Sequence, residues 1–480
     1  MRRSMQLLLS VSRRGVDGIG KQTGIGMMNL DLQPEARVGG DAGQVDRNRD
    51  SGAGPPAWRV FLWPAVAAFV ACCMGPYYLS LLRPPADRVN DFFQEWASAR
   101  NYWGGLPIYT DHTVTLPLYL GLDPSNPKYS LIEVNAHPPT SVLLGLPLAF
   151  LGYQDAVLVW NLVSLGVFAV SLAMVWRGFR IPFSSRSLFR LLAALLVCGP
   201  LVMQVSYAQL NMVILLLLTG VWAADRSQKP LTAGALLGLA SAIKLFPGFL
   251  FFYFIVRRQW KCLVAGVFTV ALVTLLTAAV FGWEAFRDYW CDALPRVAKF
   301  RGHSSNASLV GFWIKLFDPP AAGDRVVPLL RSHELALSGI AVSYAVVIAV
   351  LGWTVRCART RTERDIAFSL SLTAMLLVSP ITWDHYLLLL LVPISVMWLC
   401  PPRTVGSRVA FAAILIAFWF PPWLLYVLFL VEGRSLGTAQ PLHTFTILSY
   451  QFYALVALFI LIAVEAARLH NRMNVNRIKE

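Results

Sequence analysis

The strongest constraint on this chain is a succession of long apolar runs separated by short polar turns. Twelve runs lie at residues 58–82, 155–176, 188–203, 209–224, 231–245, 246–257, 262–281, 336–356, 365–380, 384–400, 409–430 and 446–467. A helix needs roughly 20 mostly apolar residues to cross a bilayer. Because 56% of the 480 residues are hydrophobic and only 14% are charged, we predict an all-α polytopic membrane protein with about 12 transmembrane helices.

A further apolar piece, 138–152, is too short for a comfortable crossing, and its path decides the topology. If it forms a short re-entrant or interfacial helix and returns to its own side, the basic clusters named at the end of this paragraph fall on one side of the membrane, which the positive-inside rule assigns to the cytoplasm. If it crosses instead and 231–257 is one helix, the first two clusters lie outside. We prefer the first path. The clusters are Arg177/Arg180/Arg186/Arg190, Arg226/Lys229, Arg257/Arg258/Lys261, Arg356/Arg359/Arg361/Arg364, Arg403/Arg408 and the C-terminal tail.

This topology divides the chain into a disordered cytoplasmic tail at 1–57, a membrane domain at 58–468 and a second cytoplasmic tail at 469–480. The first extracytoplasmic loop is 83–137, and a second long loop is 283–335. The net charge of +15 is explained by the cytoplasmic clusters, so no nucleic-acid partner is expected. The basic inner face fits a multi-pass protein of a bacterial plasma (inner) membrane.

The stretch Asn90 to Tyr109 follows the first span and mixes carboxylates with aromatic residues. On a helix, positions 91, 95, 98 and 102 form one stripe, and positions 92, 96, 99 and 103 form the next. This pattern predicts an amphipathic helix in the membrane interface, with aromatic side chains in the lipid boundary and carboxylates towards water. Gly104, Gly105 and Pro107 are expected to end it.

Asp91 is the first candidate for chemistry, because a carboxylate at a helix start beside aromatic residues can take a proton from a hydroxyl. The alternative is that Asp91 is the N-cap of the helix, with Gln94 completing a capping box. Glu95 is a second candidate, and its alternative is a solvated residue on the polar face.

Lys244 lies in an otherwise apolar segment with no acidic neighbour in sequence, which is costly in lipid and typical of a functional residue. Its natural partner is an anion such as a phosphate. The alternative is that its side chain extends to the membrane surface. Gln209 and Asn211 are candidate substrate ligands or helix caps. His137, before two prolines, is a candidate ligand at the membrane edge.

Asp384 and His385 belong to the densest polar group between two spans. Asp384 is suited to orient His385, which then binds a phosphate oxygen or relays a proton; the alternative is a polar turn. Arg301 lies in a basic run of the second long loop that either steers an anionic headgroup or is simply solvated. The seven cysteines show no metal-ligand spacing, so neither a metal nor a cofactor is predicted.

Several blocks of the sequence, taken in order, resemble glycosyltransferase family 87, whose members are integral-membrane enzymes of the GT-C superfamily that use polyprenyl-phosphate sugars, typically mannose. The resemblance covers roughly residues 58 to 400. Two positions depart from the family pattern: His137 stands where a tyrosine is commoner, and Tyr386 where a second histidine is common. The blocks are Asp91 with Ala97, Gly104, Gly105 and Tyr109; His137-Pro-Pro with Pro147-Leu-Ala; Gln209-Leu-Asn211; Gly234 through Lys244 to Pro247; Asn306-Ala-Ser-Leu; and Ser379-Pro-Ile-Thr-Trp-Asp-His385.

The resemblance implies a GT-C fold with its active site at the extracytoplasmic face and Asp91 as general base. It implies inverting transfer of a hexose from a polyprenyl-phosphate sugar donor to a lipid or glycan acceptor, without an evident protein partner. Lys244, His385 and Arg301 would lie near the donor phosphate. A transporter or flippase of lipid-linked sugars is the alternative, since it would use the same cations and aromatic residues without a base.

Overall fold

The computed structural model describes residues 58–126, 129, 133–182, 184–320, 326–400, 404–420, 431–432, 435–436 and 438–479. The predicted tail at 1–57 lies outside these residues. Helices account for nearly all regular structure in the described residues, together with one antiparallel hairpin of two two-residue strands, β1 (Val431–Glu432) and β2 (Ser435–Leu436). The predicted all-α class is confirmed to this extent.

The helices follow one another along the chain with short connections. In the first half they are α1 (Trp58–Leu82), α2 (Phe93–Trp103), α3 (His112–Leu120), α4 (Pro139–Gly145), η2 (Leu146–Leu148), α5 (Tyr153–Gly178), α6 (Ser185–Leu196), α7 (Gly199–Tyr207), α8 (Asn211–Arg226), α9 (Pro230–Ile243), η3 (Phe246–Leu250), α10 (Phe251–Val256) and α11 (Trp260–Phe281). In the second half they are α12 (Trp283–Asp288), η4 (Tyr289–Ala293), α13 (Leu294–Val297), η5 (Ala298–Gly302), α14 (Leu309–Phe317), α15 (His333–Cys357), α16 (Arg361–Val378), η6 (Asp384–Leu390), α17 (Leu391–Leu399), α18 (Val405–Trp419), α20 (Pro441–Phe445) and α21 (Tyr450–Lys479).

Five helical segments of the described residues are long and apolar enough to cross a membrane. A sixth is added if α6 and α7, which meet at a bend of 59°, form one span. The remaining predicted spans contain helices that are shorter or more polar, so a count of 12 crossings is not confirmed. The five segments are Phe61–Leu82, Tyr153–Gly178, Trp260–Phe281, His333–Cys357 and Pro441–Arg472. The protein is therefore a helical membrane protein with at least these candidate spans.

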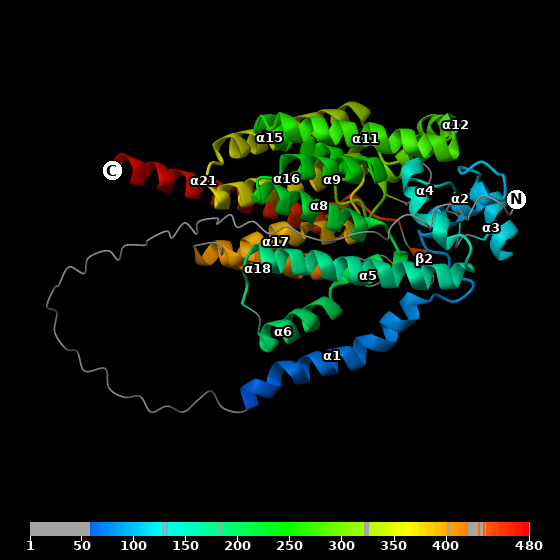
Figure 1. Cartoon of the computed structure of the whole chain (residues 1–480), viewed down its shortest axis with the longest axis horizontal. Helices are drawn as coiled ribbons and strands as arrows, with labels where there is room; N and C mark the ends of the chain where they lie inside the picture. Colours follow the sequence, from blue (N-terminus) through cyan, green and yellow to red (C-terminus); the bar gives the residue numbers. More distant parts are fainter. Residues whose placement is uncertain are drawn as a thin grey trace, which may run out of the picture. The chain divides into compact units, whose positions relative to one another are not determined.

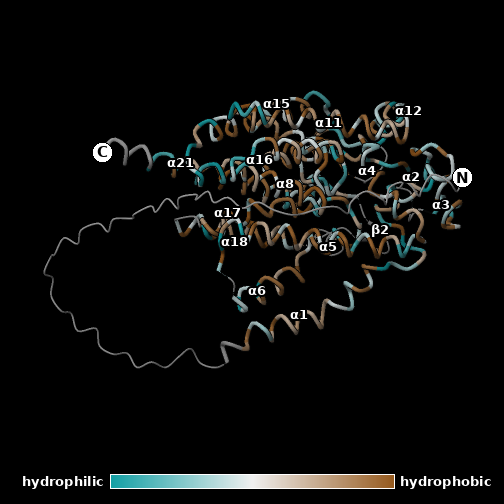
Figure 2. Tube along the Cα trace, in the orientation of Figure 1, coloured by the Kyte–Doolittle hydropathy of each residue, from teal (hydrophilic) through white to brown (hydrophobic). Residues whose placement is uncertain are grey.

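The long helices lie side by side, and the short helices α2, α3, α4 and α12 gather at one end of them (Figure 1). Apolar residues run along the long helices, and hydrophilic residues are concentrated near their ends (Figure 2). The closest packing is between α9 and α11. A Cβ added at Gly234 would lie 2.1 Å from the carbonyl oxygen of Cys262, and one at Gly238 would lie 2.4 Å from that of Gly266. Only glycine allows these two backbones to approach so closely.

The helix α2 differs from the predicted interfacial helix in what surrounds it. It ends at Trp103 before Gly104, as expected, but Phe92 and Phe93 are 0% exposed and Trp96 is 1% exposed. These rings pack inside the protein, so the prediction that they lie in the lipid boundary is wrong, and the position of the helix at a membrane interface stays a prediction. The reason is that α3, α4 and α5 supply apolar partners that a stripe pattern on one helix does not reveal.

The break near Lys244 is confirmed. The helix α9 ends at Ile243, Lys244 has an extended backbone, and the 3-10 helix η3 starts at Phe246 with Pro247 in its first turn. Proline removes a backbone donor and disfavours helical geometry in the residue before it. The piece 138–152 forms α4 and η2, and whether it re-enters the membrane stays a prediction.

Candidate active site

Asp91 precedes α2, and its neighbours on both sides are anchored in the protein. The Asn90 side-chain oxygen accepts a hydrogen bond of 2.7 Å from the Tyr153 hydroxyl, and the Phe92 side chain is fully buried. Asp91 itself is half-buried, and its Oδ2 accepts a hydrogen bond from Nε2 of Gln209. The carboxylate is thus held in place by residues from α5 and from the turn before α8.

The alternative that Asp91 caps α2 is wrong. No side chain caps this helix, and the Gln94 side-chain oxygen instead accepts a 2.8 Å hydrogen bond from the Ala136 backbone N–H. Burial raises the pKa of the Asp91 carboxyl, although the Gln209 amide and the nearby His385 act against this rise. A carboxylate with a raised pKa is a stronger proton acceptor, which suits a general base.

Lys244 is the centre of a polar network that reaches Asp91. Its Nζ donates to Oε1 of Gln209 at 3.1 Å, to Oδ1 of Asn211 at 3.0 Å and to the Tyr386 hydroxyl at 3.3 Å. The Gln209 amide therefore bridges the ammonium and the Asp91 carboxylate, since its oxygen faces Lys244 and its nitrogen faces Asp91. We call these five residues the Lys244 network.

The Lys244 ammonium has only neutral acceptors around it. The residue is 3% exposed, so the alternative that its side chain extends to the surface is wrong. Its Nζ also lies 4.8 Å from the centre of the Tyr386 ring, and within the described part of the chain no carboxylate is within ion-pair distance. A buried cation without a paired anion is costly. Binding an anion next to Nζ would therefore be favourable.

The turn between α7 and α8 places Gln209 and Asn211 in this network. Ala208 adopts a left-handed conformation with φ of 50°, and its carbonyl oxygen accepts a 2.8 Å hydrogen bond from Nε1 of Trp160. Gln204 donates to the Gln209 carbonyl oxygen at 2.5 Å and accepts from Nδ2 of Asn211 at 3.3 Å. No side chain caps α8, so the capping alternative is wrong for both residues.

Glu95 is not a solvated surface residue, since it is 1% exposed. Its Oε1 lies 2.5 Å from Nδ1 of His137, and the Ser141 hydroxyl donates to the same oxygen at 3.4 Å. The helix α4 approaches α2 closely here, because a Cβ added at Gly145 would lie 2.7 Å from the Glu95 carbonyl oxygen. The pair is further fixed by the Tyr109 hydroxyl, which donates to the His137 carbonyl oxygen at 2.6 Å.

His385 is 2% exposed and is held by its neighbour in sequence. Oδ1 of Asp384 accepts from the His385 backbone N–H at 2.7 Å and lies 3.1 Å from the ring Nδ1. The other ring nitrogen, Nε2, is buried and has no hydrogen-bond partner among the described residues. With Asp384 on Nδ1, Nε2 is the nitrogen left to contact a ligand.

Asn306 joins the second long loop to the loop before η6. Its Nδ2 donates to the carbonyl oxygens of Arg301 at 2.8 Å and Pro380 at 3.0 Å, and its Oδ1 accepts from the Thr382 backbone N–H at 2.9 Å. Arg301 belongs to this loop, is exposed, and contacts Asn306 through its backbone carbonyl oxygen. The structure therefore does not place the Arg301 guanidinium in the Lys244 network.

The fold brings the other predicted site residues close to Asp91 and Lys244. Asp91 interacts electrostatically with His385, His137 and Glu95, in addition to its bond with Gln209. Asp91 and Gln209 are separated by 118 positions in the sequence. In the described ranges, no group of three or more His, Cys, Asp or Glu residues is arranged to hold a metal ion.

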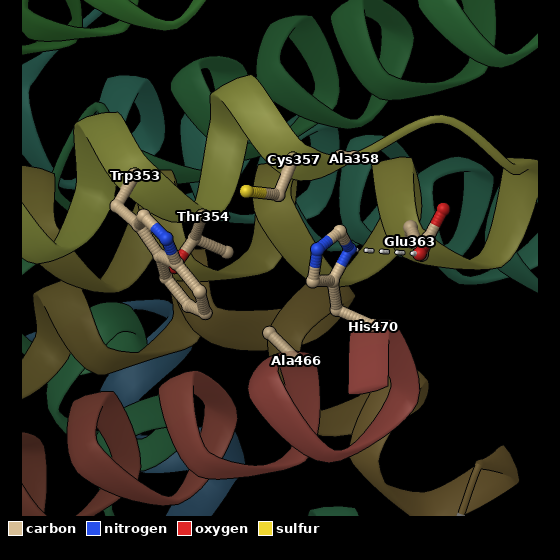
Figure 3. A pocket seen from close by; sticks show the side chains of 7 residues that line it. All are labelled: Trp353, Thr354, Cys357, Ala358, Glu363, Ala466 and His470. Atoms are coloured by element: carbon tan, nitrogen blue, oxygen red, sulfur yellow. Dashed lines mark ion pairs between the residues drawn. The ribbon is translucent and has the colours of Figure 1, made fainter. Parts of the chain in front are cut away.

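A separate small pocket lies between α15, α16 and α21 and contains none of these residues (Figure 3). In it, His470 Nδ1 is 4.0 Å from Glu363 Oε1. Glu363 is occupied in capping α16, because its Oε2 accepts from the backbone N–H groups of Arg359 and Thr360. The pocket is at the other end of α16 from the loop that leads to His385. Its lining residues are Trp353, Thr354, Cys357, Ala358, Glu363, Ala466 and His470.

The sequence pattern of glycosyltransferase family 87 matches residues 135–380, which is just over half of the chain. This match contains His137, Gln209, Asn211 and Lys244, whose contacts are described above. The chain belongs to glycosyltransferase family 87. It is therefore a membrane glycosyltransferase, and the predicted resemblance is confirmed. No solved structure matches this family 87 chain at a significant level.

Named relatives of this family 87 glycosyltransferase are mycobacterial enzymes. It is 24% identical to a polyprenol-phosphate-mannose-dependent alpha-(1-2)-phosphatidylinositol mannoside mannosyltransferase of Mycobacterium tuberculosis, over 68% of this chain and 73% of the relative. It is 27% identical to the corresponding pentamannoside mannosyltransferase of Mycolicibacterium smegmatis, over 61% and 63%. It is also 24% identical to an alpha-(1->3)-arabinofuranosyltransferase of Mycobacterium tuberculosis, over 53% and 54%. The matches to the last two relatives cover less than two thirds of their length.

Sequence reasoning missed three residues that shape this site. Tyr386 belongs to the polar group of Asp384 and His385 and departs from the family pattern, but the sequence assigns it no role. In the structure its hydroxyl and ring both contact Lys244. Gln204 and Tyr153 carried no signal, because a glutamine and a tyrosine in apolar helices are common. The one sequence feature that indicates a role for Gln204 is its position five residues before Gln209, which is close enough for a contact across the turn between α7 and α8.

Proposed function

We propose that this glycosyltransferase transfers a hexose, specifically mannose, from a polyprenyl-phosphate sugar to a hydroxyl of a lipid or glycan acceptor, with inversion at the anomeric carbon. The observation that carries the proposal is the Gln209 amide, which couples the Asp91 carboxylate to the buried Lys244 ammonium. A transferase of this kind needs a base for the acceptor and a cation for the leaving phosphate, and the Lys244 network supplies both.

In the proposed reaction, Asp91 takes the proton of the acceptor hydroxyl. The hydroxyl oxygen then bonds to the anomeric carbon while the bond between that carbon and the phosphate oxygen breaks. The electron pair of that bond leaves with the polyprenyl phosphate. The raised pKa of Asp91, caused first by burial, makes the carboxylate a better proton acceptor than an exposed aspartate. Its hydrogen bond to Gln209 keeps one oxygen fixed and leaves the other for the acceptor.

The leaving phosphate gains negative charge, and two groups are placed to stabilise it. Lys244 exchanges contacts with neutral amide oxygens for contact with a phosphate oxygen. Nε2 of His385 is buried without an acceptor or donor among the described residues and is oriented by Asp384 through Nδ1. Because fixed groups need not reorganise during the reaction, they stabilise developing charge better than water does.

The donor preference rests on the relatives, two of which are named as polyprenol-phosphate-mannose-dependent enzymes. The arabinofuranosyltransferase relative leaves a pentose as the competing sugar. Glu95 and His137 lie beside Asp91 and are proposed to contact the sugar or the acceptor. The site is proposed to face the extracytoplasmic side, with both termini cytoplasmic, since the arginine-rich turns lie at the other helix ends.

The test is Asp91→Asn in the full chain, reconstituted in liposomes with a synthetic polyprenyl-phosphate mannose donor. We expect transfer to fall by about 10³-fold while donor binding is retained, since asparagine keeps the shape but accepts no proton. Asp123→Asn is the matched control, because Asp123 is an exposed aspartate of the same loop and should leave transfer unchanged. Transfer that survives Asp91→Asn would overturn the base assignment.

The same liposomes separate transfer from transport. A flippase of lipid-linked sugars would move the labelled donor across the bilayer in both wild type and Asp91→Asn, and would form no glycosylated product in either. A product that appears only with wild type and with Asp123→Asn supports the transferase. Donor movement without any product would replace it with the transporter.

A further inference from the structure

Four helix ends meet at the end of the bundle away from Asp91. They are the last residues of α5, α8 and α17 and the first turn of α16. The helix α8 links the two regions, because it begins at Asn211 in the Lys244 network and ends at Arg226. At 1.5 Å per residue the two residues are about 22 Å apart along the helix. Any ligand bound at Arg226 is therefore separate from the active site.

Arg226 lies against two neighbouring aromatic rings, and part of its guanidinium has no hydrogen-bond acceptor among the described residues. Its guanidinium carbon lies 4.6 Å from the centre of the Phe179 ring and 5.1 Å from that of Trp222. Two of its nitrogens, Nε and Nη1, are buried without an acceptor among the described residues. The side chain is 14% exposed, which leaves Nη2 as its open edge. An arginine with unused donors is suited to bind an anion.

The surrounding charges also favour an anion. Oδ2 of Asp365 is 3.6 Å from Nε of Arg226, too far for a hydrogen bond, and its Oδ1 accepts from Trp222 at 2.9 Å. Two exposed arginines, Arg180 and Arg361, interact electrostatically with Arg226. Arg226 and Arg361 both interact with the Asp365 carboxylate, and Arg180 adds a third positive charge beside Arg226. The neighbouring Asp225 is occupied by its own ion pair.

The position of the cluster points to a lipid as the source of the anion. Trp398, at the end of α17, is 67% exposed, and Cys400 two residues later interacts electrostatically with Arg226. Exposed tryptophans of membrane proteins prefer the level of the lipid headgroups. A phosphate at that level would lie beside the arginine cluster while its acyl chains contact the apolar surface of the helices.

We infer that Arg226, Arg180 and Arg361 form a binding site for the phosphate of an anionic phospholipid headgroup. Planar guanidinium groups match phosphate oxygens in pairs, and each arginine near a headgroup adds to the attraction for anionic lipid. Arg226 lies against the Phe179 and Trp222 rings, and the exposed arginines contact the phosphate from the solvent side. The site is independent of the proposed reaction, since it uses none of the Lys244 network.

The experiment is native mass spectrometry of the full chain in neutral detergent, with phosphatidylglycerol or phosphatidylcholine of identical acyl chains. We expect wild type to retain phosphatidylglycerol about tenfold better than phosphatidylcholine. The double variant Arg180→Gln/Arg361→Gln should lose this preference and still fold, because both residues are exposed. Arg356→Gln is the matched control, an exposed arginine at the end of α15 outside the cluster, and should keep the preference.

Arg226→Gln should abolish the preference as well, and its fold is checked by thermal unfolding. An inorganic phosphate arm separates the two sources of the anion. If millimolar inorganic phosphate displaces bound phosphatidylglycerol as effectively as added phosphatidylglycerol does, the site binds free phosphate and the lipid assignment is overturned. Equal loss of preference in Arg356→Gln and in the double variant would overturn the site, since the effect would then follow net charge alone.

Discussion

The two ends of α8 bury charge in opposite ways. At one end, the Lys244 ammonium is surrounded by amide and hydroxyl oxygens and has no carboxylate at ion-pair distance in the described part of the chain. Near the other end, Asp225 is paired with Arg257 at 2.7 Å and also accepts from Tyr253 and Gln259. A saturated ion pair stabilises the fold, whereas a cation with neutral partners is ready to bind an anion. Under the proposed function, Asp225 and Arg257 are structural charges and Lys244 is a functional one.

The largest loss of stability is expected when the Asp225–Arg257 ion pair is broken. Arg257→Met leaves the Asp225 carboxylate buried without its cation, which costs about 3 to 5 kcal/mol. The free energy of unfolding, measured in detergent, should fall by that amount, while transfer by the folded fraction should stay near wild type. Lys261→Met, which removes an exposed cation nearby, should change stability little. A loss of transfer in folded Arg257→Met would contradict the interpretation that the Asp225–Arg257 pair is structural only.

The largest effect on activity beyond Asp91 is expected from Lys244→Met. In the proposed reaction this removes the cation that stabilises the leaving phosphate, so transfer should fall by about 10² to 10³-fold. The Gln209 and Asn211 oxygens lose a donor but no carboxylate loses its cation, so stability should fall less than in Arg257→Met. Lys315→Met provides the contrast. Its Nζ donates to three backbone carbonyl oxygens, so its loss should lower the unfolding temperature. Comparable activity and stability changes in the two variants would remove the distinction.

The acid limb of the pH–rate profile tests which groups set the pKa of Asp91. A base must be deprotonated to act, so a raised pKa means that activity disappears as the pH falls through a higher value than for an exposed aspartate. Gln209→Leu removes a hydrogen bond that lowers the pKa of Asp91, so the acid limb of kcat/KM should move to higher pH. An unchanged limb would indicate that another group titrates.

The smallest effect is expected from Glu95→Gln, which should shift the acid limb in the direction opposite to that of Gln209→Leu. The Glu95 charge raises the pKa of Asp91 more weakly than burial does, so its removal should move the acid limb slightly to lower pH. The variant also breaks the contact with His137. Transfer at neutral pH should fall by about tenfold through misplacement of that ring. Ser141→Ala, which removes only the long hydrogen bond to Glu95, serves as the milder control.

Much of the Lys244 region was predictable because its signals are local. A lysine within an apolar segment and a proline three positions later predict a functional charge and a broken helix. The structure confirms the broken helix and buries the lysine, and its functional role stays a proposal. Arg301 shows the limit of such reasoning. Its basic run looked suited to a phosphate, yet the residue is exposed, and Asn306 is what ties its loop to the site.

The sequence by itself determined the membrane class, the family and most of the candidate residues for the site, because hydrophobicity, helix breaks and motif order are properties of short segments. The tertiary structure decided how those residues are paired. It buried Phe92, Phe93 and Trp96 in protein, placed Gln209 between Asp91 and Lys244, and set Glu95 against His137. These outcomes depend on which helices pack together, and the pattern along any single helix is the same whether its neighbour is lipid or protein.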